Sequence, residues 1–409
     1  MIPNLKSKLR NLSSSSIAVS SRRDADSQTQ SCISASDILS LKCYEKHISF
    51  SSSFVWGYKT INSLLDETTR NLGAICQLLS INKPHLNRIL FIDTETTGLS
   101  GGTGTVAFLV GIGYFRNDQF HIHQLFMRDY SEEFFLLQKL GEIFREYELL
   151  ISFNGKSFDI PLLDSRFIMH RLREYQKDFS HMDLLHLSRR IWKLRLDSCS
   201  LKSLEHHILH VERAKDIPSA EIPGRYFSFL ESGDMALIED VLIHNQYDIL
   251  SLVFLLGEIV HYYTNPMSGK YSQDLYSLGR IYEKAGQTGR AIECYQKADE
   301  LGMGGRAKSS LSLLYKKNRS FKKAAQIWRE MIEAGQGGTM PYFELAKYLE
   351  HHVRDFNGAL EHTCKAIEYI RRMGIPWSDS GELSELYKRR NRLIKKLNRL
   401  NENKKILMF

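Results

Sequence analysis

Residues 88–99 join a short apolar run to two closely spaced carboxylates. The apolar run at 90–92, bounded by polar and turn residues, predicts a buried strand. Residues two apart on a strand lie on one face, so Asp93 and Glu95 are expected to converge at the strand's end. Their combined negative charge is costly unless a cation lies between them. Mg²⁺ or Mn²⁺ suits such an all-oxygen setting, although a lone Asp-x-Glu is more often a solvated strand edge.

The composition predicts more than one domain and a polyanionic partner. A chain of 409 residues with 43% hydrophobic content exceeds what one core usually holds. A formal charge of +8 favours partners such as nucleic acid. Six cysteines are scattered and form no Cys-x-x-Cys pair, at Cys32, Cys43, Cys76, Cys199, Cys294 and Cys364. This pattern favours a reducing compartment and argues against a zinc or disulfide framework.

The first 53 residues contain sixteen serines and few aromatics, so we expect residues 1–53 to form a disordered arm. The chain shows no secretory apolar core and no apolar run near the roughly 20 residues that a membrane span needs. We therefore expect a cytoplasmic protein with no membrane association.

The segment that follows the two carboxylates predicts an antiparallel meander. Residues 106–115 and 120–126 form two further apolar runs with a short polar turn between them. The glycine-rich turn at 98–104 lacks the Gly-Lys-Ser/Thr ending of a phosphate loop, which excludes a nucleoside-triphosphate site of that type. A helix is expected over 131–147, with Ser131 as its N-cap.

Two later segments carry further polar residues at the ends of predicted elements. Residues 149–163 predict a strand, a turn and a helix, with Asn154 at the strand's end and Asp159 at the start of the helix. In a long helix predicted over 235–262, His244 and Asp248 are four apart and share one face. A hydrogen-bonded core histidine is the alternative interpretation of His244.

The order of these motifs resembles the DEDD exonuclease superfamily, whose domain has the ribonuclease H-like fold. The three motifs are Asp93-x-Glu95, Asn154-x-x-x-Phe158-Asp159 and His244-x-x-x-Asp248. The surrounding sequence is closer still to the bacterial YprB-like proteins, which join such a domain to tetratricopeptide-like repeats. The resemblance implies an α/β ribonuclease H-like domain, a mixed sheet flanked by helices, over 54–265, followed by an all-α repeat domain.

The resemblance also implies a function and a set of site residues. The chain would be a metal-dependent 3′–5′ exonuclease that hydrolyses phosphodiester bonds with two divalent ions, Mg²⁺ or Mn²⁺, and acts on single-stranded nucleic acid or a 3′ end. The implied metal ligands and catalytic carboxylates are Asp93, Glu95, Asp159 and Asp248, and the implied general base is His244. The implied substrate-binding residues are Thr96, Gly98, Leu99, Asn154 and Phe158.

One spacing departs from the family pattern. In the histidine-bearing branch of the superfamily the histidine usually precedes the last aspartate by five residues, whereas His244 precedes Asp248 by four. Four is the spacing of the tyrosine-bearing branch. The residue five positions back, Ile243, has no acid-base chemistry. His244 therefore combines the side chain of one branch with the spacing of the other.

Three features lie between the second and third motifs, and the first two allow two interpretations each. Asp183 either supports the site or caps a strand end or helix. Lys202 and Arg225 either contact a nucleic-acid backbone or are solvated surface residues. The segment 216–226, which contains two prolines and a glycine, is expected to be a rigid, exposed loop.

The remainder of the chain predicts helices. Residues 279–298 correspond to residues 312–331 at a shift of 33, and a third copy starts near Tyr342, which is typical of tetratricopeptide-like repeats over 271–372. Such repeats offer a groove for a protein partner or RNA, or buttress the catalytic domain. Residues 381–409 predict a basic amphipathic helix whose charged face meets phosphates or is simply solvated.

Two functions from different classes are compatible with the sequence. The first is the exonuclease. The second is a nucleic-acid or protein-binding scaffold that keeps the ribonuclease H-like fold with little or no turnover. The presence of all four carboxylates favours the first, because clustered acids without a metal repel phosphate.

Overall fold

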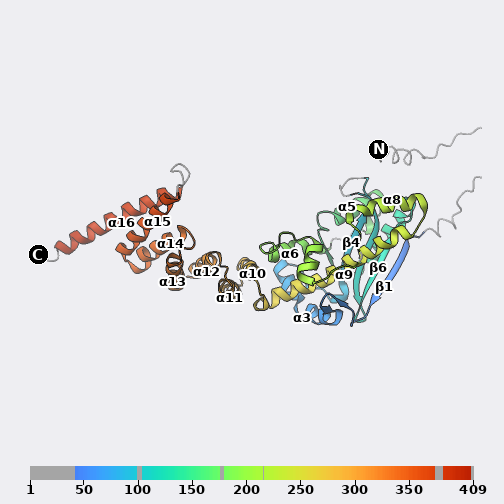
Figure 1. Cartoon of the computed structure of the whole chain (residues 1–409), viewed down its shortest axis with the longest axis horizontal. Coiled ribbons are helices and arrows are strands. Elements are labelled where there is room, and N and C mark those ends of the chain that lie inside the picture. The colour runs from blue at the N-terminus through green and yellow to red at the C-terminus, as the bar shows by residue number, and fades with distance from the viewer. Residues whose placement is uncertain (1–41, 99–103, 176–178, 215, 374–380, 407–409) are drawn as a thin grey trace, which may run out of the picture. The chain divides into compact units, whose positions relative to one another are not determined.

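The computed structural model describes residues 42–98, 104–175, 179–214, 216–373 and 381–406 (Figure 1). The main sheet contains β1 (Tyr44–Phe50), β4 (Ile89–Thr96), β5 (Ala107–Arg116), β6 (Gln119–Phe126), β7 (Leu149–Ser152) and β8 (Ser180–Asp183). A separate two-stranded ribbon contains β2 (Val55–Trp56) and β3 (Lys59–Thr60). The helices around them are α3 (Ile61–Leu79), α4 (Glu133–Phe144), α5 (Asp159–Met169), α6 (Leu184–Trp192), α7 (Leu201–Leu204), α8 (Ile222–Ser232) and α9 (Ala236–Thr264).

The main sheet is mixed, with the strand order β1-β6-β5-β4-β7-β8. Strands β4, β5 and β6 form the expected antiparallel meander, and β7 and β8 extend it in parallel with β4. Helices cover both faces of this sheet, and many more helices follow it along the chain, which confirms the expected fold class.

The boundary of the expected disordered arm is wrong for residues 44–50. These residues form β1, which pairs with β6 from Tyr44 opposite Phe126 to Phe50 opposite Phe120. The hydrogen-bonding partner lies about 70 or more residues away in the sequence, so the serine-rich local composition does not reveal it. Residues 1–41 of the arm lie outside the described residues.

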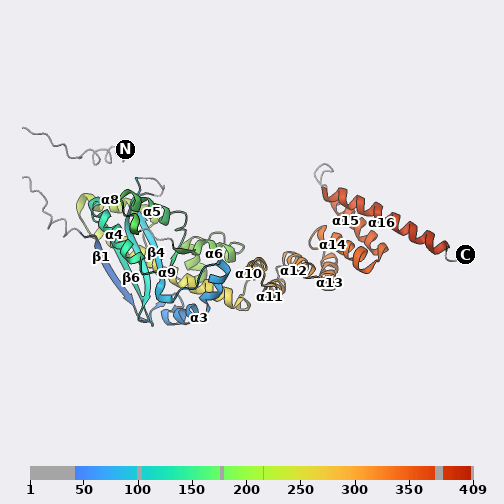
Figure 2. The same ribbon diagram turned by 180° about the vertical axis from the view of Figure 1, so that it is seen from behind.

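The two faces of the sheet pack against different helices because side chains alternate along each strand. Phe91 and Ile151 face the core that contains residues of α3, α6 and most of α9. Leu90 and Ile92 face the other core, with residues of α4, α5, α8 and the first turns of α9. The two opposite views place α9 on one side of the strands and α4 on the other (Figures 1 and 2). Asp93 and Glu95 lie two and four positions after Phe91 on the strand, so their side chains are on the same face as Phe91, the α9 side.

Helix α9 approaches β5 closely at two glycines. A Cβ atom on Gly111 would lie 2.0 Å from Asn245 Oδ1, and one on Gly113 would lie 2.6 Å from Ile249 Cγ2. Gly111 also pairs with Asp93 across the β4–β5 ladder. The absence of a side chain at Gly111 therefore sets how near α9 comes to the carboxylates.

Two local predictions in this domain are wrong. The N-cap near residue 131 is Asp129, whose side chain accepts from the Ser131 amide, and a 3₁₀ turn, η2 (Tyr130–Glu132), precedes α4. The expected exposed loop over 216–226 instead ends in a 3₁₀ turn, η5 (Ser219–Glu221), and the first turn of α8. Tyr226 is fully buried, with its ring stacked on Phe108 at a centroid distance of 3.9 Å. A proline in the first helical turn loses no hydrogen bond, which is why Pro223 fits there.

The helices after residue 270 follow the spacing predicted from the sequence. They are α10 (Ser272–Lys284), α11 (Thr288–Glu300), α12 (Gly305–Lys317), α13 (Phe321–Glu333), α14 (Met340–Tyr348), the π-helix η7 (Leu349–Val353), α15 (Phe356–Arg372) and α16 (Gly381–Ile406). Helices α12 and α13 begin 33 residues after α10 and α11. That these helices are of the tetratricopeptide type stays a prediction.

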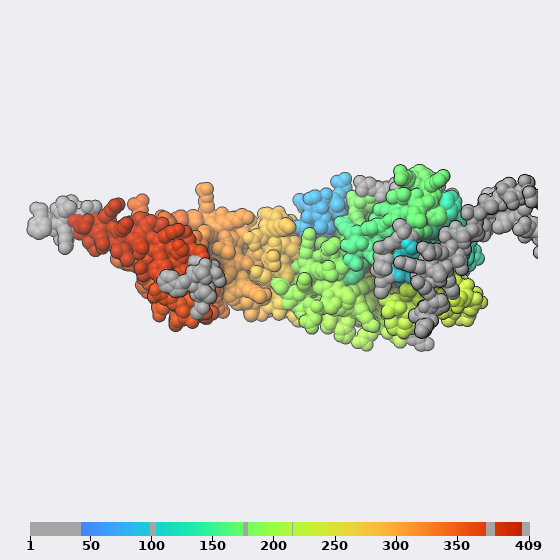
Figure 3. Space-filling view, turned by 90° about the horizontal axis from the view of Figure 1, so that it is seen from above, coloured from blue at the N-terminus to red at the C-terminus, as the bar shows by residue number. Residues whose placement is uncertain are grey.

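The first of these helices packs directly on the preceding domain. Arg195, just after α6, forms an ion pair with the buried Asp274 of α10 at 2.9 Å. The space-filling view shows the segment after residue 270 adjoining the residues around α6 (Figure 3). Among the residues that the structure describes, no helix has the length and apolar character needed to cross a bilayer.

Some of the basic residues of α16 form ion pairs within the protein. Arg389, Arg392 and Lys396 surround the buried carboxylate of Glu350, with the nearest contact 2.7 Å from Arg389. Although burial works to raise it, the pKa of Glu350 falls to about 2 because of these cations. The predicted amphipathic helix is present, but these three cations do not form a free basic face.

We expect Gly111→Ala to destabilise the protein by about 1–3 kcal/mol, because the added methyl group forces Asn245 and α9 away from β5. Urea unfolding followed by circular dichroism measures this change. Gly289→Ala on α11 is the matched control, since nothing lies within 4 Å of its Cβ position and alanine favours helix. Equal stability of the two variants would contradict the close packing of α9.

Candidate active site

Three elements bring the predicted catalytic residues to one place. Strand β4 presents Asp93 and Glu95 on the face that α9 covers. Helix α9 presents His244 and Asp248, one turn apart, toward that strand. Asp159 is the first residue of α5, directly after the loop that leaves β7.

His244 lies at the centre of a group of carboxylates. Its Nε2 atom is 3.4 Å from Asp248 Oδ2 and 3.9 Å from Glu95 Oε1. Ligand atoms of Glu95, His244 and Asp248 all lie within 4.8 Å of one another. The side chains of Glu95, His244 and Asp248 are only 12%, 8% and 15% exposed, so the group is largely enclosed by protein.

The other ring nitrogen of His244 has a partner of its own. Nδ1 lies 2.5 Å from Asp216 Oδ1. A carboxylate only accepts hydrogen bonds, so this contact places the ring proton on Nδ1. The Nε2 atom that faces Glu95 and Asp248 is then free to accept a proton.

Asp93 and Asp159 are held by neutral donors. Asn245 Nδ2 donates to Asp93 Oδ2 at 3.0 Å, and Gln124 Nε2 in turn donates to Asn245 Oδ1 at 3.0 Å. The Thr94 hydroxyl donates to Asp159 Oδ1. These bonds fix the orientation of both carboxylates without neutralising their charge.

The electrostatics of the site are dominated by burial and mutual repulsion. Burial raises the pKa of Asp93 well above its usual range, and the charges of Asp248, Glu95 and Asp159 raise it further. Burial and the charges of Asp248 and Asp159 do the same to the pKa of Glu95. Burial raises the pKa of Asp159 to about 6, although the bond from Thr94 opposes this. All four carboxylates therefore act on one another.

One buried cation partly compensates these charges. Arg213 pairs with Asp248, with Glu205 at 2.5 Å and with Asp216 at 3.3 Å. Although burial works to lower the pKa of Arg213, the carboxylates of Asp248 and Glu205 raise it overall. The guanidinium also lies 5.5 Å from the centre of the Tyr247 ring. It leaves Asp248 Oδ2 directed at His244.

The donor set fits divalent cations of the Mg²⁺ or Mn²⁺ type. Asp248 lies beside Asp93, Glu95 and Asp159, whose ionised forms are costly in this enclosed space, and a hard cation with oxygen ligands removes that cost. The carboxylates and the imidazole come from one strand and two helices that are far apart in the sequence. The fold therefore creates the cluster.

The predicted substrate-binding residues border the carboxylates along the chain. Thr96 ends β4 and its hydroxyl donates to the Gly98 carbonyl at 2.9 Å. Asn154 has a positive φ of 65° and an exposed side chain, and Phe158 is half-buried just before α5. Leu99 lies outside the described residues.

Asp183 combines the two roles considered for it. Its side chain caps α6 by accepting from the Leu185 amide at 3.0 Å. It also accepts from the amides of Asn154 at 2.9 Å and Lys156 at 3.2 Å. The carboxylate thus secures the loop that leads to Asp159.

The two cations considered for backbone binding differ in their surroundings. Arg225 pairs with Asp240 at 3.0 Å, so its charge is partly used within the protein. Lys202 is exposed. Neither residue belongs to the carboxylate cluster.

Comparison with known proteins is consistent with this geometry. A family model of the RNase H superfamily matches residues 90–260, the range that includes Asp93, Glu95, Asp159 and Asp248. "Uncharacterized protein YprB" of Bacillus subtilis (strain 168) is 31% identical over 331 residues, which are 78% of this chain and 79% of that protein. The chain belongs to the same family as YprB and contains a domain of the RNase H superfamily over residues 90–260.

One solved structure gives a weaker match to this chain. The family B DNA polymerase from the hyperthermophilic archaeon Pyrobaculum calidifontis matches with a TM-score of 0.35 and 13% identity. The match covers 50% of this YprB-family chain and 30% of the polymerase chain.

Four residues that orient the site were not predicted from the sequence. Thr94 and Asn245 lie inside or beside the recognised motifs, so the motifs themselves carry a usable signal for them. Arg213 and Asp216 precede the third motif by about thirty residues, and no motif marks them. Their importance follows from contacts that exist only in the folded chain.

We expect Asp93→Asn to raise the melting temperature of the metal-free protein by a few degrees at pH 7, because it removes one of the mutually repelling charges. Differential scanning calorimetry in EDTA measures this shift. Asp66→Asn, at an exposed position on α3, is the control that leaves the melting temperature unchanged. A lower melting temperature for Asp93→Asn would argue against electrostatic strain.

We expect the affinity for Mn²⁺ to be at least about 10-fold weaker at pH 5 than at pH 7. The pKa of Asp159 is raised to about 6, so below that pH a proton occupies the carboxylate that the cation needs. The same linkage makes the metal-free protein lose stability as pH rises from about 4 to 6, because the folded state binds more protons than the unfolded state there. Titration calorimetry in two buffers measures the affinity and the protons released. A pH-independent affinity would contradict the assignment of Asp159.

Proposed function

We propose that this YprB-family chain is a metal-dependent 3′–5′ exonuclease that hydrolyses phosphodiester bonds of nucleic acid. The observation that carries the proposal is the convergence of four carboxylates and one histidine in a domain of the RNase H superfamily. The order of the three motifs supports the 3′–5′ direction through its resemblance to the DEDD exonucleases. The basic net charge of +8 is compatible with a nucleic-acid substrate in the cytoplasm.

The carboxylates are proposed to hold two divalent cations, Mg²⁺ or Mn²⁺. Asp93, Glu95, Asp159 and Asp248 would be the ligands that hold these ions. The bound ions would supply charge neutralisation at the scissile phosphate and a lower pKa for the attacking water. The fixed bonds from Asn245 to Asp93 and from Thr94 to Asp159 preorganise the ligands before substrate arrives.

His244 is proposed to accept the proton of the attacking water. The contact with Asp216 keeps the ring proton on Nδ1 and leaves Nε2 as the acceptor, and it stabilises the imidazolium once the proton has been transferred. Although His244 has the spacing of the tyrosine branch, its Nε2 lies within 4 Å of both Glu95 and Asp248. This proximity supports the assignment of His244 as the base, although the family pattern would place a histidine at the position of Ile243.

Arg213 is proposed to position Asp248 rather than to react. Its guanidinium fixes one oxygen of Asp248 while the other faces His244. Ser251 donates to Glu205 at 2.5 Å, and Glu205 in turn pairs with Arg213, so the guanidinium is itself immobilised. Thr96, Gly98, Leu99, Asn154 and Phe158 are proposed to border the path of the single-stranded 3′ end.

The test is degradation of 5′-labelled single-stranded DNA and RNA of equal sequence with Mn²⁺, with Mg²⁺ and with EDTA. We expect a metal-dependent ladder that shortens from the 3′ end, and a loss of at least about 10³-fold in rate for Asp93→Asn. Asp66→Asn, which makes the same substitution at an exposed site, should cleave like the wild type.

Retained binding without cleavage of either strand, by folded wild-type protein supplied with metal, would contradict the exonuclease. That result would support the scaffold with an RNase H-like fold and little or no turnover. Cleavage that persists in EDTA would instead exclude a role for the carboxylates as metal ligands.

A further inference from the structure

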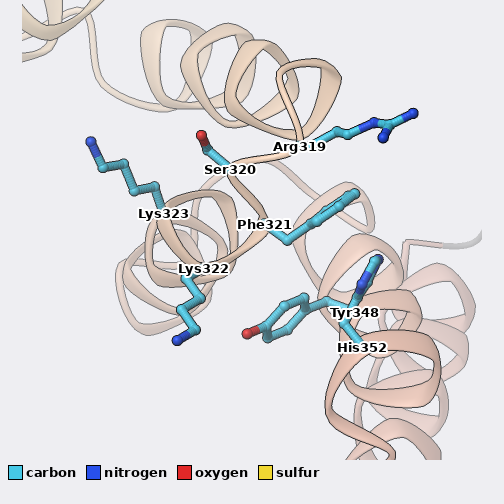
Figure 4. Close-up of a pocket in the computed structure, with 7 residues that line it drawn as sticks. All are labelled: Arg319, Ser320, Phe321, Lys322, Lys323, Tyr348 and His352. Atoms are coloured by element: carbon cyan, nitrogen blue, oxygen red, sulfur yellow. The ribbon is translucent and has the colours of Figure 1, made fainter.

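A cavity of about 470 Å³ lies where α13, α14 and η7 meet. Its lining combines three aromatic side chains, three cations and one serine, from Arg319, Ser320, Phe321, Lys322, Lys323, Tyr348 and His352 (Figure 4). No acidic residue is among these lining residues. We call this cavity the aromatic-basic pocket.

The rings of the aromatic-basic pocket are stacked in series. The centroids of Phe321 and His352 are 3.9 Å apart with an interplanar angle of 28°, and those of Tyr348 and His352 are 5.8 Å apart at 26°. His352 is exposed, while Phe321 and Tyr348 are half-buried. Aromatic side chains that stay near solvent in a stacked series offer a platform on which a planar ring can add.

The cations of the pocket carry charge that no acid neutralises. In the part of the chain that the structure describes, no carboxylate forms an ion pair with Arg319, Lys322 or Lys323, and all three are exposed. The Lys323 ammonium lies 5.4 Å from the centre of the Tyr315 ring, a contact that leaves its charge unneutralised. Lysines nearby behave differently, since Lys316 and Lys347 both pair with Glu344. The ends of the three cationic side chains extend to different sides of the rings (Figure 4). Their charge is therefore free to meet an anionic ligand on more than one side.

We propose that the aromatic-basic pocket binds single-stranded nucleic acid, with a base against the stacked rings and the flanking phosphates on Arg319, Lys322 and Lys323. A single strand exposes both its bases and its phosphates, whereas a duplex hides the faces of its bases. An acidic peptide supplies negative charge but no base to stack on the rings. A volume of about 470 Å³ is within the range of small-ligand pockets, so it accommodates one nucleotide unit. The identity of the ligand rests on the proposed function. The pocket adds a contact for the strand that lies outside the carboxylate site.

Binding is tested with the full chain carrying Asp93→Asn, in EDTA, so that no strand is cleaved and the metal-free acids repel phosphate. Fluorescence anisotropy follows labelled single-stranded DNA and RNA of about 20 nucleotides at several salt concentrations. Adding Lys322→Ala and Lys323→Ala should raise the Kd at least about 10-fold and flatten the log–log salt slope by about 1.4, since each lost phosphate contact contributes about 0.7.

The matched control removes the same two charges elsewhere. Lys365→Ala with Lys388→Ala alters lysines that already pair with Glu361 and Glu385, so the Kd should change less than about twofold. His352→Ala keeps every pocket cation and should raise the Kd about 5-fold with an unchanged salt slope, because it removes stacking alone.

Equal binding by the pocket variant and the control variant would overturn the inference. Two results together would also overturn it: effective competition by polyglutamate, and an unchanged Kd for His352→Ala. They would describe a surface for acidic peptides or for polyanions in general. The proposed function can fail separately. Loss of binding in the pocket variants without any cleavage by the wild type supports the pocket alone, and cleavage with unchanged binding supports the exonuclease alone.

Discussion

Repulsion among buried carboxylates is the constraint on which the rest of the site depends. Asp93, Glu95, Asp159 and Asp248 act on one another, and burial raises the pKa of the first three. One guanidinium, that of Arg213, neutralises only part of this charge. A fold that keeps such a cluster bears a standing electrostatic cost, and the divalent cations that we propose would relieve that cost where the proposed substrate needs charge neutralisation.

Helix α9 connects this cluster to the cores of the domain. Its first turns belong to the core on the α4 side of the sheet, and its later turns pack with α3 and α6. Between them, Asn245 fits over Gly111 and reaches Asp93. The same packing that stabilises the helix therefore sets the position of His244 and Asp248, so stability and site geometry are coupled.

The strands of the meander, the α9 helix and the residues that converge could be predicted, because these follow from periodicity and from motifs with fixed spacing. Strand β1, whose partner is distant in the sequence, and the burial of Tyr226 against Phe108 could not. Nor could the pairing of Arg389 and Arg392 with Glu350. In each case a long-range contact outweighed the local composition.

The sequence by itself determined the parity of Asp93 and Glu95 on their strand, the shared helical face of His244 and Asp248, and the 33-residue spacing of α10 to α13. Backbone geometry sets these relations locally. Only the tertiary structure decided that Asp216 orients His244, that Arg213 holds Asp248, and that the rings of Phe321, Tyr348 and His352 stack beside the pocket cations. Such contacts join residues from separate elements, and their geometry exists only once those elements have packed.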